Sequence, residues 1–311
     1  MATEQVSGNR RNIIGLGFGL GLAGAAGAVA GAAGGFALAP KTGPQVRVDG
    51  RARFRNKVVL ITGATSGIGA AAAKMFAVEG GRVTFCGRRT ERGEQVERDI
   101  KAAGGEAKFI RADVRVEDDV RTFVDAAASL YGGLDVCFNN AGITIEHPVQ
   151  EFSASEWDDV VNTNLRGNFF ALKYEIPHLV KRGGGVVVVT SSSNAIATGP
   201  NRAAYSATKR GLAAFVQSAA QDCADKNIRI NTLIPGTTDT ELIRRAAGMM
   251  DAPDSIWEAS VALWAKSNVG VAHRVARPEE IAAAALMMAS DEFTYMNAAQ
   301  IVIDGGKTAH A

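Results

Sequence analysis

The 311-residue sequence has few of the residues that usually mark metal sites, disulfide frameworks or nucleic-acid contacts. Its three cysteines, Cys86, Cys137 and Cys223, lie far apart, without a CxxC spacing or a histidine cluster, which argues against disulfides and against a bound metal such as zinc. We expect them to be small buried residues. The net charge of +2, with no long basic stretch, argues against a nucleic-acid partner.

Aromatic residues are also scarce, at 6%, although 47% of the residues are hydrophobic. Alanine, valine, isoleucine and leucine must therefore fill the core, and such residues suit packed layers of helices and strands. The chain is long enough for one large domain or two small ones. Composition thus favours an α/β protein.

Charged residues are missing from residues 13–39, a run long enough to cross a membrane as a helix. Of these 27 residues 18 are Gly or Ala, so the run is less hydrophobic than a stable membrane anchor. Arg10 and Arg11 precede it, and small residues at 37–39 end it, which is the layout of a signal peptide. Two arginines, one variable residue and two apolar residues resemble the twin-arginine export signal.

Three interpretations of this N-terminal segment remain open. Export by the twin-arginine machinery would place the folded domain in the periplasm, with cleavage after Ala39 or Ala30. An uncleaved membrane anchor with the domain facing the cytoplasm, and a flexible cytoplasmic tail, are the alternatives. We expect residues 1–39 to be the signal or anchor, residues 40–53 a linker and residues 54–311 one folded domain.

A glycine-rich turn follows the first candidate for a buried strand, residues 58–61, and precedes an alanine-rich helical stretch at 70–79. Its glycines, Gly63, Gly67 and Gly69, have the spacing G-x-x-x-G-x-G. Glycines let the backbone approach a pyrophosphate, and a helix N-terminus supplies N–H groups and a positive dipole end. The turn predicts a dinucleotide site, although such turns also occur without a ligand.

The residues after the second strand candidate, 82–86, bear on which dinucleotide is bound. A fold that selects NAD places Asp or Glu here, about 20 residues after the glycines, to hold the ribose hydroxyls. This chain has Gly87, Arg88 and Arg89 instead, and a guanidinium binds a 2′-phosphate well. The sequence therefore favours NADP(H), with Arg88 as the phosphate ligand. In the alternative, both arginines lie in a solvated loop and NAD(H) is accepted.

Tyr205 and Lys209 lie four residues apart in a predicted helix over residues 203–226 and so share one helix face. A free tyrosine has a pKa near 10, and a neighbouring cation favours the phenolate and lowers that pKa. Ser192 stands thirteen residues before Tyr205, just after the buried strand candidate 186–189. Tyr205 is therefore a candidate general base.

Taken in order, these motifs resemble the short-chain dehydrogenases/reductases over about 250 residues, from Thr62 to Asp304-Gly305-Gly306. The resemblance implies a single doubly wound Rossmann domain with a mostly parallel seven-stranded sheet. It implies NAD(P)-dependent interconversion of an alcohol with a ketone or aldehyde, by a catalytic group of Asn164, Ser192, Tyr205 and Lys209. The implied cofactor ligands are Gly63, Thr65, Ser66, Gly67, Ile68, Gly69, Arg88, Asp113, Val114, Asn140, Ala141, Gly142, Tyr205, Lys209, Pro235, Gly236 and Thr240.

The family pattern also separates neighbouring candidates. Spacing to Tyr205 selects Ser192 over the flanking serines, and the Leu-x-Gly that follows selects Asn164 over Asn162. In the family this Asn kinks its helix and anchors a water for proton relay. The family usually has Thr-Gly where this chain has Asn297 and Ala298, in a region of subunit contact. The resemblance implies a homo-oligomer, a tetramer or dimer, and this departure falls on its contact region.

The sequence does not name the substrate. Specificity should reside in residues 237–276, whose Met, Leu and Trp residues either line an apolar pocket or pack a lid. Four basic residues there either meet an anionic substrate or face water: Arg244, Arg245, Lys266 and Arg274. A non-catalytic dinucleotide sensor or scaffold, and an epimerase or dehydratase on the same fold, remain alternatives.

Overall fold

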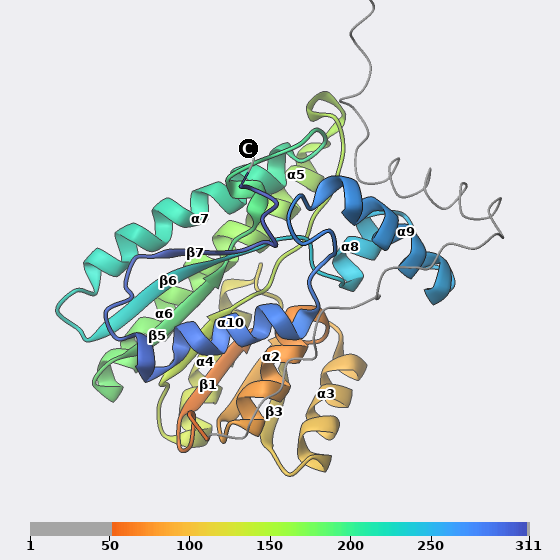
Figure 1. The fold of residues 1–311 in the computed structure, drawn as a ribbon. Coiled ribbons are helices and arrows are strands. Elements are labelled where there is room, and N and C mark those ends of the chain that lie inside the picture. The colour runs from red at the N-terminus through yellow and green to blue at the C-terminus, as the bar shows by residue number, and fades with distance from the viewer. Residues whose placement is uncertain (1–51, 310–311) are drawn as a thin grey trace, which may run out of the picture.

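A computed structural model describes residues 52–309, and the sequence-based assignments for residues 1–51 lie outside this part. One seven-stranded sheet runs through the molecule in the order β3-β2-β1-β4-β5-β6-β7, and every strand pairing is parallel (Figure 1). The predicted doubly wound fold is confirmed. The strands are β1 Val58–Thr62, β2 Arg82–Gly87, β3 Glu106–Arg111, β4 Val136–Asn139, β5 Gly185–Thr190, β6 Ile228–Pro235 and β7 Gln300–Ile303.

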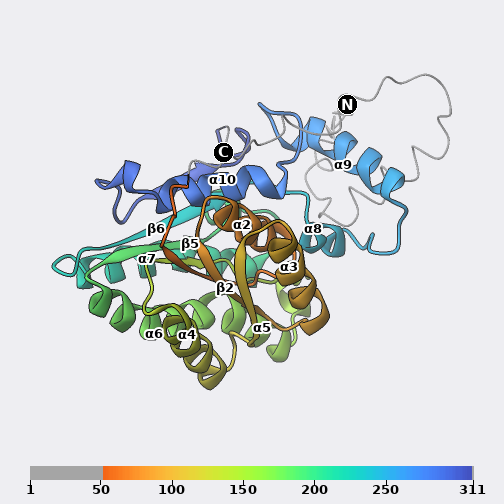
Figure 2. The ribbon, with the colours of Figure 1, turned by 90° about the horizontal axis from the view of Figure 1, so that it is seen from below.

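Helices cover both faces of this sheet (Figure 2). One face packs against α2 Gly67–Val78, α3 Thr90–Ala102 and α10 Pro278–Ala289, and the other against α4 Glu117–Tyr131, α6 Gly167–Arg182 and α7 Ala203–Asp222. Because both faces are covered, the central strands are continuous apolar runs, and β1 is buried over its whole length. The three cysteines are buried and free, as predicted.

Three further helices stand near the carboxyl ends of the strands, where the site lies. Helix α5 Ala154–Val161 continues through a π-helical turn, Asn162–Arg166, into α6. Two helices between β6 and α10 form the lid, α8 Glu241–Ala246 and α9 Asp254–Asn268. The predicted helix over 203–226 ends earlier, at Asp222. Short 3₁₀ turns complete the element order at Val149–Glu151, Ser193–Ala195 and Asp291–Phe293.

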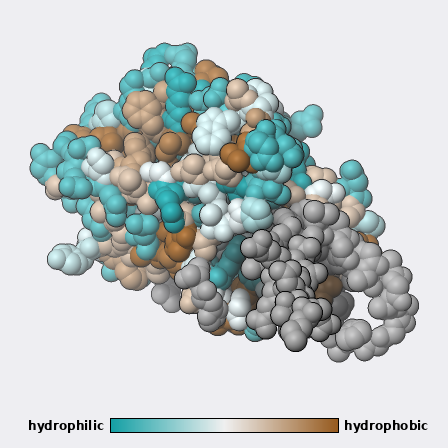
Figure 3. All heavy atoms as spheres, turned by 90° about the horizontal axis from the view of Figure 1, so that it is seen from above, coloured by the Kyte–Doolittle hydropathy of each residue, from teal (hydrophilic) through white to brown (hydrophobic). Residues whose placement is uncertain are grey.

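The sheet order reverses between β1 and β4, since β1 is flanked by β2 on one side and by β4 on the other. In open α/β sheets, ligands bind in the crevice outside the carboxyl ends of the strands at such a switch point. Within residues 52–309, no helix combines the length and hydrophobicity needed to cross a membrane. Figure 3 shows hydrophilic and hydrophobic residues interspersed over the coloured part of one face.

Candidate active site

A cleft of about 520 Å³ opens at this switch point and runs from the glycine-rich turn to helix α8. The cleft brings together nearly all residues that the sequence proposed for catalysis and cofactor binding, including Ser192, Tyr205 and Lys209. Gly69 and Asn164 do not line it. Both lie directly behind the lining, as their contacts below show.

The glycine-rich turn leaves no room for side chains. Gly63 has φ +70°, and a Cβ there would come within 2.6 Å of the Ala141 Cα. A Cβ on Gly69 would lie 2.4 Å from the Gly63 carbonyl oxygen and 2.7 Å from the Asn140 amide nitrogen. Helix α2 begins at Gly67, and the first N–H groups of a helix lack intrahelical partners. The turn is therefore a bare backbone cradle that ends at a helix N-terminus, which fits a pyrophosphate.

The loop after β4 is fastened to this turn. The Thr62 hydroxyl accepts hydrogen bonds from the backbone N–H groups of Asn140, at 3.1 Å, and Ala141, at 3.2 Å. The Asn140 amide donates to the Gly63 carbonyl at 3.2 Å. Hydrogen bonds of Thr62 and Asn140 thus fasten the two sides of the cleft to each other.

Arg89, rather than Arg88, is the arginine that reaches the glycine-rich turn. Its guanidinium donates to the Thr65 hydroxyl at 2.9 Å and to the Ser66 hydroxyl at 2.6 Å. Arg88 lines the cleft with an exposed side chain, and its charge helps to lower the pKa of Asp113. Side chains alternate in direction where β2 ends, so adjacent arginines take different positions. The cleft therefore has two cations near the expected 2′-phosphate position.

Asp113 is one of the cofactor ligands that the family resemblance implies, and its carboxylate is already engaged. It accepts hydrogen bonds from the Arg115 guanidinium at 2.6 Å and 3.1 Å. Burial would raise the pKa of Asp113, but hydrogen bonds and charge from Arg115 outweigh burial and lower it. Asp113 is thus held ionised at the rim of the cleft.

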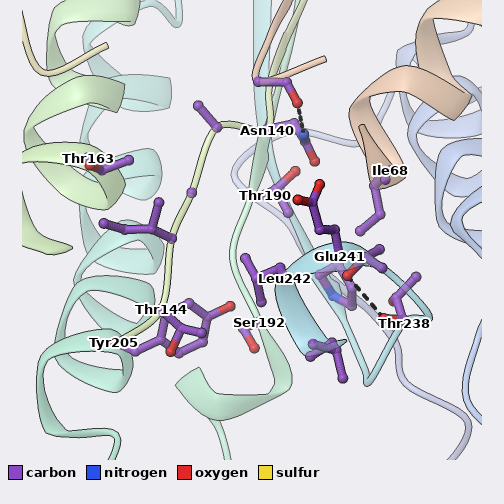
Figure 4. A pocket seen from close by; sticks show the side chains of 18 of the residues that line it. Ile68, Asn140, Thr144, Thr163, Thr190, Ser192, Tyr205, Thr238, Glu241 and Leu242 are labelled. Atoms are coloured by element: carbon purple, nitrogen blue, oxygen red, sulfur yellow. Dashed lines mark hydrogen bonds between the residues drawn. The ribbon is translucent and has the colours of Figure 1, made fainter. Parts of the chain in front are cut away.

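Tyr205 and Ser192 meet at the other end of the cleft (Figure 4). Ser192 caps a short 3₁₀ turn after β5, where its hydroxyl oxygen accepts a bond from the Asn194 N–H at 3.2 Å. Burial raises the pKa of Tyr205, whereas a hydrogen bond with Ser192 and the charge of Arg202 act in the opposite direction. The phenol is therefore protonated at neutral pH in the protein alone.

Lys209 is buried one turn further along α7. Its ammonium donates to the Thr190 carbonyl at 2.8 Å and lies 5.7 Å from the centre of the Tyr205 ring. Burial lowers the pKa of Lys209 to about 8. We expected Lys209 to lower the pKa of Tyr205, but in this structure burial prevails and that pKa is raised.

Asn164 sits in the π-helical turn, with its side chain fully buried. Its amide oxygen accepts from the Ile143 N–H at 2.8 Å, and its amide nitrogen donates to the Ile143 carbonyl at 2.9 Å and to the Thr208 hydroxyl at 3.2 Å. Thr208 in turn donates to the Tyr205 carbonyl at 2.7 Å. Asn164 thereby joins the loop after β4 to the helix that carries Tyr205.

Comparison with known proteins agrees with this geometry. The family model described as "short chain dehydrogenase" matches residues 57–250. The chain belongs to the short-chain dehydrogenase family. It is 37% identical over 256 residues to an uncharacterized oxidoreductase of Thermotoga maritima, covering 82% of this chain and 99% of the relative.

Two further similarities point to relatives with named activities. The chain is 34% identical over 259 residues to a cyclohexanol dehydrogenase of an Acinetobacter species, covering 83% of this chain and 97% of the relative. The crystal structure of levodione reductase matches with a TM-score of 0.77 and 33% identity, covering 83% of this chain and all (100%) of that chain. This short-chain dehydrogenase is therefore an oxidoreductase with alcohol dehydrogenases among its relatives.

The apolar residues of the lid in this short-chain dehydrogenase mostly pack on one another. Met249, Trp257 and Val261 form a small buried cluster, and the Trp257 indole donates to the Asp239 carboxylate at 2.9 Å. Leu242 lines the cleft from α8 (Figure 4). The lid is thus a packed unit that turns only a few side chains toward the site.

Sequence reasoning missed several charged residues that line this cleft, among them Glu146, Arg202 and Lys307. Two of them had a signal in the sequence, since Arg202 precedes Tyr205 by three residues and Lys307 directly follows Asp304-Gly305-Gly306. Glu146 lies in a loop without a motif. Glu241 of the lid was missed as well, although it is bonded to Arg89.

Proposed function

We propose that this short-chain dehydrogenase catalyses the reversible oxidation of a cyclic secondary alcohol to the ketone, with NADP(H) favoured and NAD(H) as the alternative. The observation that carries the proposal is the meeting of Ser192 and Tyr205, with Lys209 behind them, in the same cleft as a bare dinucleotide cradle.

The residues of the cradle fit a dinucleotide. The backbone at Gly63, Gly67 and Ile68 would hold the pyrophosphate, and Asp113 with Val114 would border the adenine. Arg89 and Arg88 are the cations available for a 2′-phosphate, and we favour NADP(H) because these arginines, and not a carboxylate, directly follow β2 in the sequence. When bound, the nicotinamide supplies the group that accepts or donates a hydride.

Tyr205 would act as the general base in oxidation and the general acid in reduction. In oxidation its oxygen takes the proton of the substrate hydroxyl while the carbinol carbon loses a hydride, which leaves a ketone. Ser192 would donate a hydrogen bond to the reacting oxygen, since its own oxygen already accepts from Asn194. The positive charge of Lys209 would favour the phenolate of Tyr205, against the burial that raises the pKa of this tyrosine. Asn164 would hold the proton path from α7 in place.

The substrate class rests on the pocket and on the relatives. Apolar residues line the cleft from two sides, Ile145 from the loop after β4 and Leu242 from the lid. Such walls suit a compact hydrocarbon body, and a cyclohexanol dehydrogenase is among the relatives. A cyclic secondary alcohol satisfies both observations.

The test mixes the purified enzyme and cyclohexanol with NADP⁺ or NAD⁺ and follows the absorbance of the reduced cofactor at 340 nm. The reverse reaction is measured with cyclohexanone and the reduced cofactor. Formation of reduced cofactor in step with ketone supports the proposal. Binding of NADPH without turnover of any alcohol in a broad panel would indicate a sensor or scaffold. Product formation without net change in the cofactor would indicate an epimerase or dehydratase.

For residues 1–39 we propose a twin-arginine export signal and a periplasmic enzyme, supported by Arg10, Arg11 and the uncharged run after them. Mass spectrometry of the protein from the periplasmic fraction of its host tests this. A chain shortened by about 30–39 residues supports export. A full-length chain in the membrane fraction would indicate a membrane anchor in place of an export signal.

We also propose that the enzyme is a homo-oligomer. Mass spectrometry under native conditions would show the mass of the assembly.

A further inference from the structure

Besides Ser192 and Tyr205, three charged side chains line the cleft, Glu146, Arg202 and Lys307. They come from the loop after β4, the residue that precedes α7 and the segment after β7. The charges of Arg202 and Glu146 both act on the pKa of Tyr205, so these two adjoin the reacting group, and both also act on the pKa of Lys307. We call these three residues the charged end of the cleft.

Two members of the charged end form a shielded ion pair. The Arg202 Nε donates to the Glu146 carboxylate at 3.2 Å, and its Nη1 lies 3.4 Å from the Asn194 amide oxygen. The side chains are only 11% and 15% exposed, so the pair is largely out of water. Glu146 is therefore already neutralised by Arg202.

Lys307 adds a second positive charge to this end. Its ammonium lies 3.4 Å from the Thr237 hydroxyl and 5.8 Å from the centre of the Trp264 ring. Among the described residues, no carboxylate lies within 4.0 Å of it. Burial and the charge of Arg202 lower the pKa of Lys307 to about 8, so it is still mostly protonated at neutral pH.

The segment after β7 holds Lys307 in this position. The Asp304 carboxylate accepts bonds from the backbone N–H groups of Gly306, at 2.9 Å, and Thr308, at 2.8 Å. Asp304 also accepts from the Thr308 hydroxyl at 2.6 Å, so its charge is engaged in its own turn. Because this turn is fixed, the lysine side chain is directed into the cleft rather than into solvent.

A half-buried ammonium that no carboxylate neutralises is costly unless a ligand supplies the opposite charge. We infer that the substrate is a hydroxy acid or keto acid, whose carboxylate binds Lys307, with Arg202 beside it, while its alcohol or ketone carbon lies at Tyr205. This rests on the proposed function and names its substrate class. The apolar walls at Ile145 and Leu242 would contact the hydrocarbon between the two ends.

The basic residues that the sequence offered for an anionic substrate are paired with carboxylates or lie outside the cleft. Arg274 donates two hydrogen bonds of 2.7 Å to Glu280, and Arg244 pairs with Asp254 at 2.8 Å. Arg245 lines the cleft, but its charge is paired with Glu241 at 3.1 Å. Lys266 is exposed on α9 and is not among the residues that line the cleft. We therefore assign the contact with an anionic substrate to Lys307 and Arg202 instead of to these residues.

The test compares 4-hydroxycyclohexanecarboxylate with its uncharged carboxamide and with cyclohexanol in NADP⁺-linked oxidation. We expect a kcat/KM for the carboxylate at least about tenfold above that for the carboxamide. Lys307→Met should remove that preference, and Lys307→Arg should keep most of it. Glu146→Gln should lower the KM for the carboxylate, because it removes the negative charge that competes for Arg202.

Lys266→Met is the matched control, because it removes one positive charge from the lid without touching the cleft. If it weakened the carboxylate preference as much as Lys307→Met, general attraction of anions would replace the proposed contact. Oxidation of cyclohexanol without any carboxylate preference would overturn the inference and leave the proposed function intact.

A binding measurement keeps the inference testable apart from turnover. Calorimetric titration with cyclohexanecarboxylate should give a Kd about tenfold weaker for Lys307→Met than for the unaltered protein. Equal binding to both proteins would overturn the site. If no alcohol were oxidised, the proposed function would fail, and this titration would still decide whether Lys307 binds a carboxylate.

Discussion

Glu241 of α8 accepts a 2.6 Å hydrogen bond from the Arg89 guanidinium, which ties the lid to the loop after β2. Arg92 of α3 donates to the same carboxylate oxygen. Arg89 is one of the two cations near the position expected for a 2′-phosphate, so Glu241 competes with that phosphate for it. Burial would raise the pKa of Glu241, but Arg89 and Arg92 lower it, so the competing carboxylate is ionised.

Glu241→Gln should therefore strengthen the binding of NADPH more than that of NADH. We expect a gain of about tenfold in the ratio of the two dissociation constants, because a repulsive charge near the phosphate is removed. Titration of the protein fluorescence with each cofactor measures this. Glu279→Gln, an exposed position on α10, is the control. An equal effect on both cofactors would show that Glu241 acts only by holding the lid.

A buried carboxyl on α6 predicts a pH-dependent stability. Glu175 accepts a 2.9 Å hydrogen bond from Asn139, and burial raises its pKa from 4.5 to about 7. Between these pH values the unfolded chain loses the proton while the folded chain keeps it, so stability falls as pH rises from about 4.5 to 7. The difference in pKa corresponds to about 3 kcal/mol at most.

Glu175→Gln should remove this loss, because a neutral amide needs no proton to stay buried. Its amide nitrogen could donate to the Asn139 amide oxygen, which has no other partner among the described residues. Urea unfolding at pH 5 and pH 8 should show the variant gaining stability relative to the unaltered protein as pH rises. Glu94→Gln, at an exposed position on α3, should leave the difference in stability between pH 5 and pH 8 the same as in the unaltered protein. If the stability of Glu175→Gln and that of the unaltered protein changed equally between pH 5 and pH 8, the account would be contradicted.

Ala298 predicts a stabilising substitution. It has φ +56°, in the left-handed region, and its N–H donates to the Ile230 carbonyl at 2.9 Å. For a residue with a Cβ, the left-handed conformation costs about 1–2 kcal/mol. Glycine avoids this strain, but it loses more backbone entropy on folding, which cancels part of the gain. Ala298→Gly should stabilise the fold by about 1 kcal/mol and raise Tm by about 2–4 °C in calorimetry. Ala298→Val should lower Tm, and a lower Tm for the glycine variant would refute the assignment of strain.

The sequence predicted the sheet and most of the cleft because their signals are local. Strand, glycine turn and helix follow one another within a few residues, and i, i+4 spacing alone sets Tyr205 and Lys209 on one face. Arg89 was missed because a one-residue step at a strand end reverses the direction of a side chain. Sequence spacing does not show which way the chain turns there.

Contacts between distant segments could not be predicted. Glu146 and Arg202 are 56 residues apart, and Glu175 is 36 residues from Asn139. In a helix sequence Glu175 looks like an ordinary surface residue, and only packing of α6 on the sheet buries it. Lys209 was expected to lower the pKa of Tyr205, but the burial of both groups, which spacing does not reveal, reverses that balance in the protein alone.

The central claim is that Tyr205 exchanges the proton of the substrate. The most direct test is the kcat of Tyr205→Phe in NADP⁺-linked oxidation of cyclohexanol, with NADPH affinity measured alongside and Tyr295→Phe, a fully exposed position, as the control. The account predicts a fall in kcat of at least about 10²-fold with cofactor affinity retained. A variant that kept more than about a tenth of the kcat would contradict it, because general acid–base groups contribute about 10²–10⁴-fold.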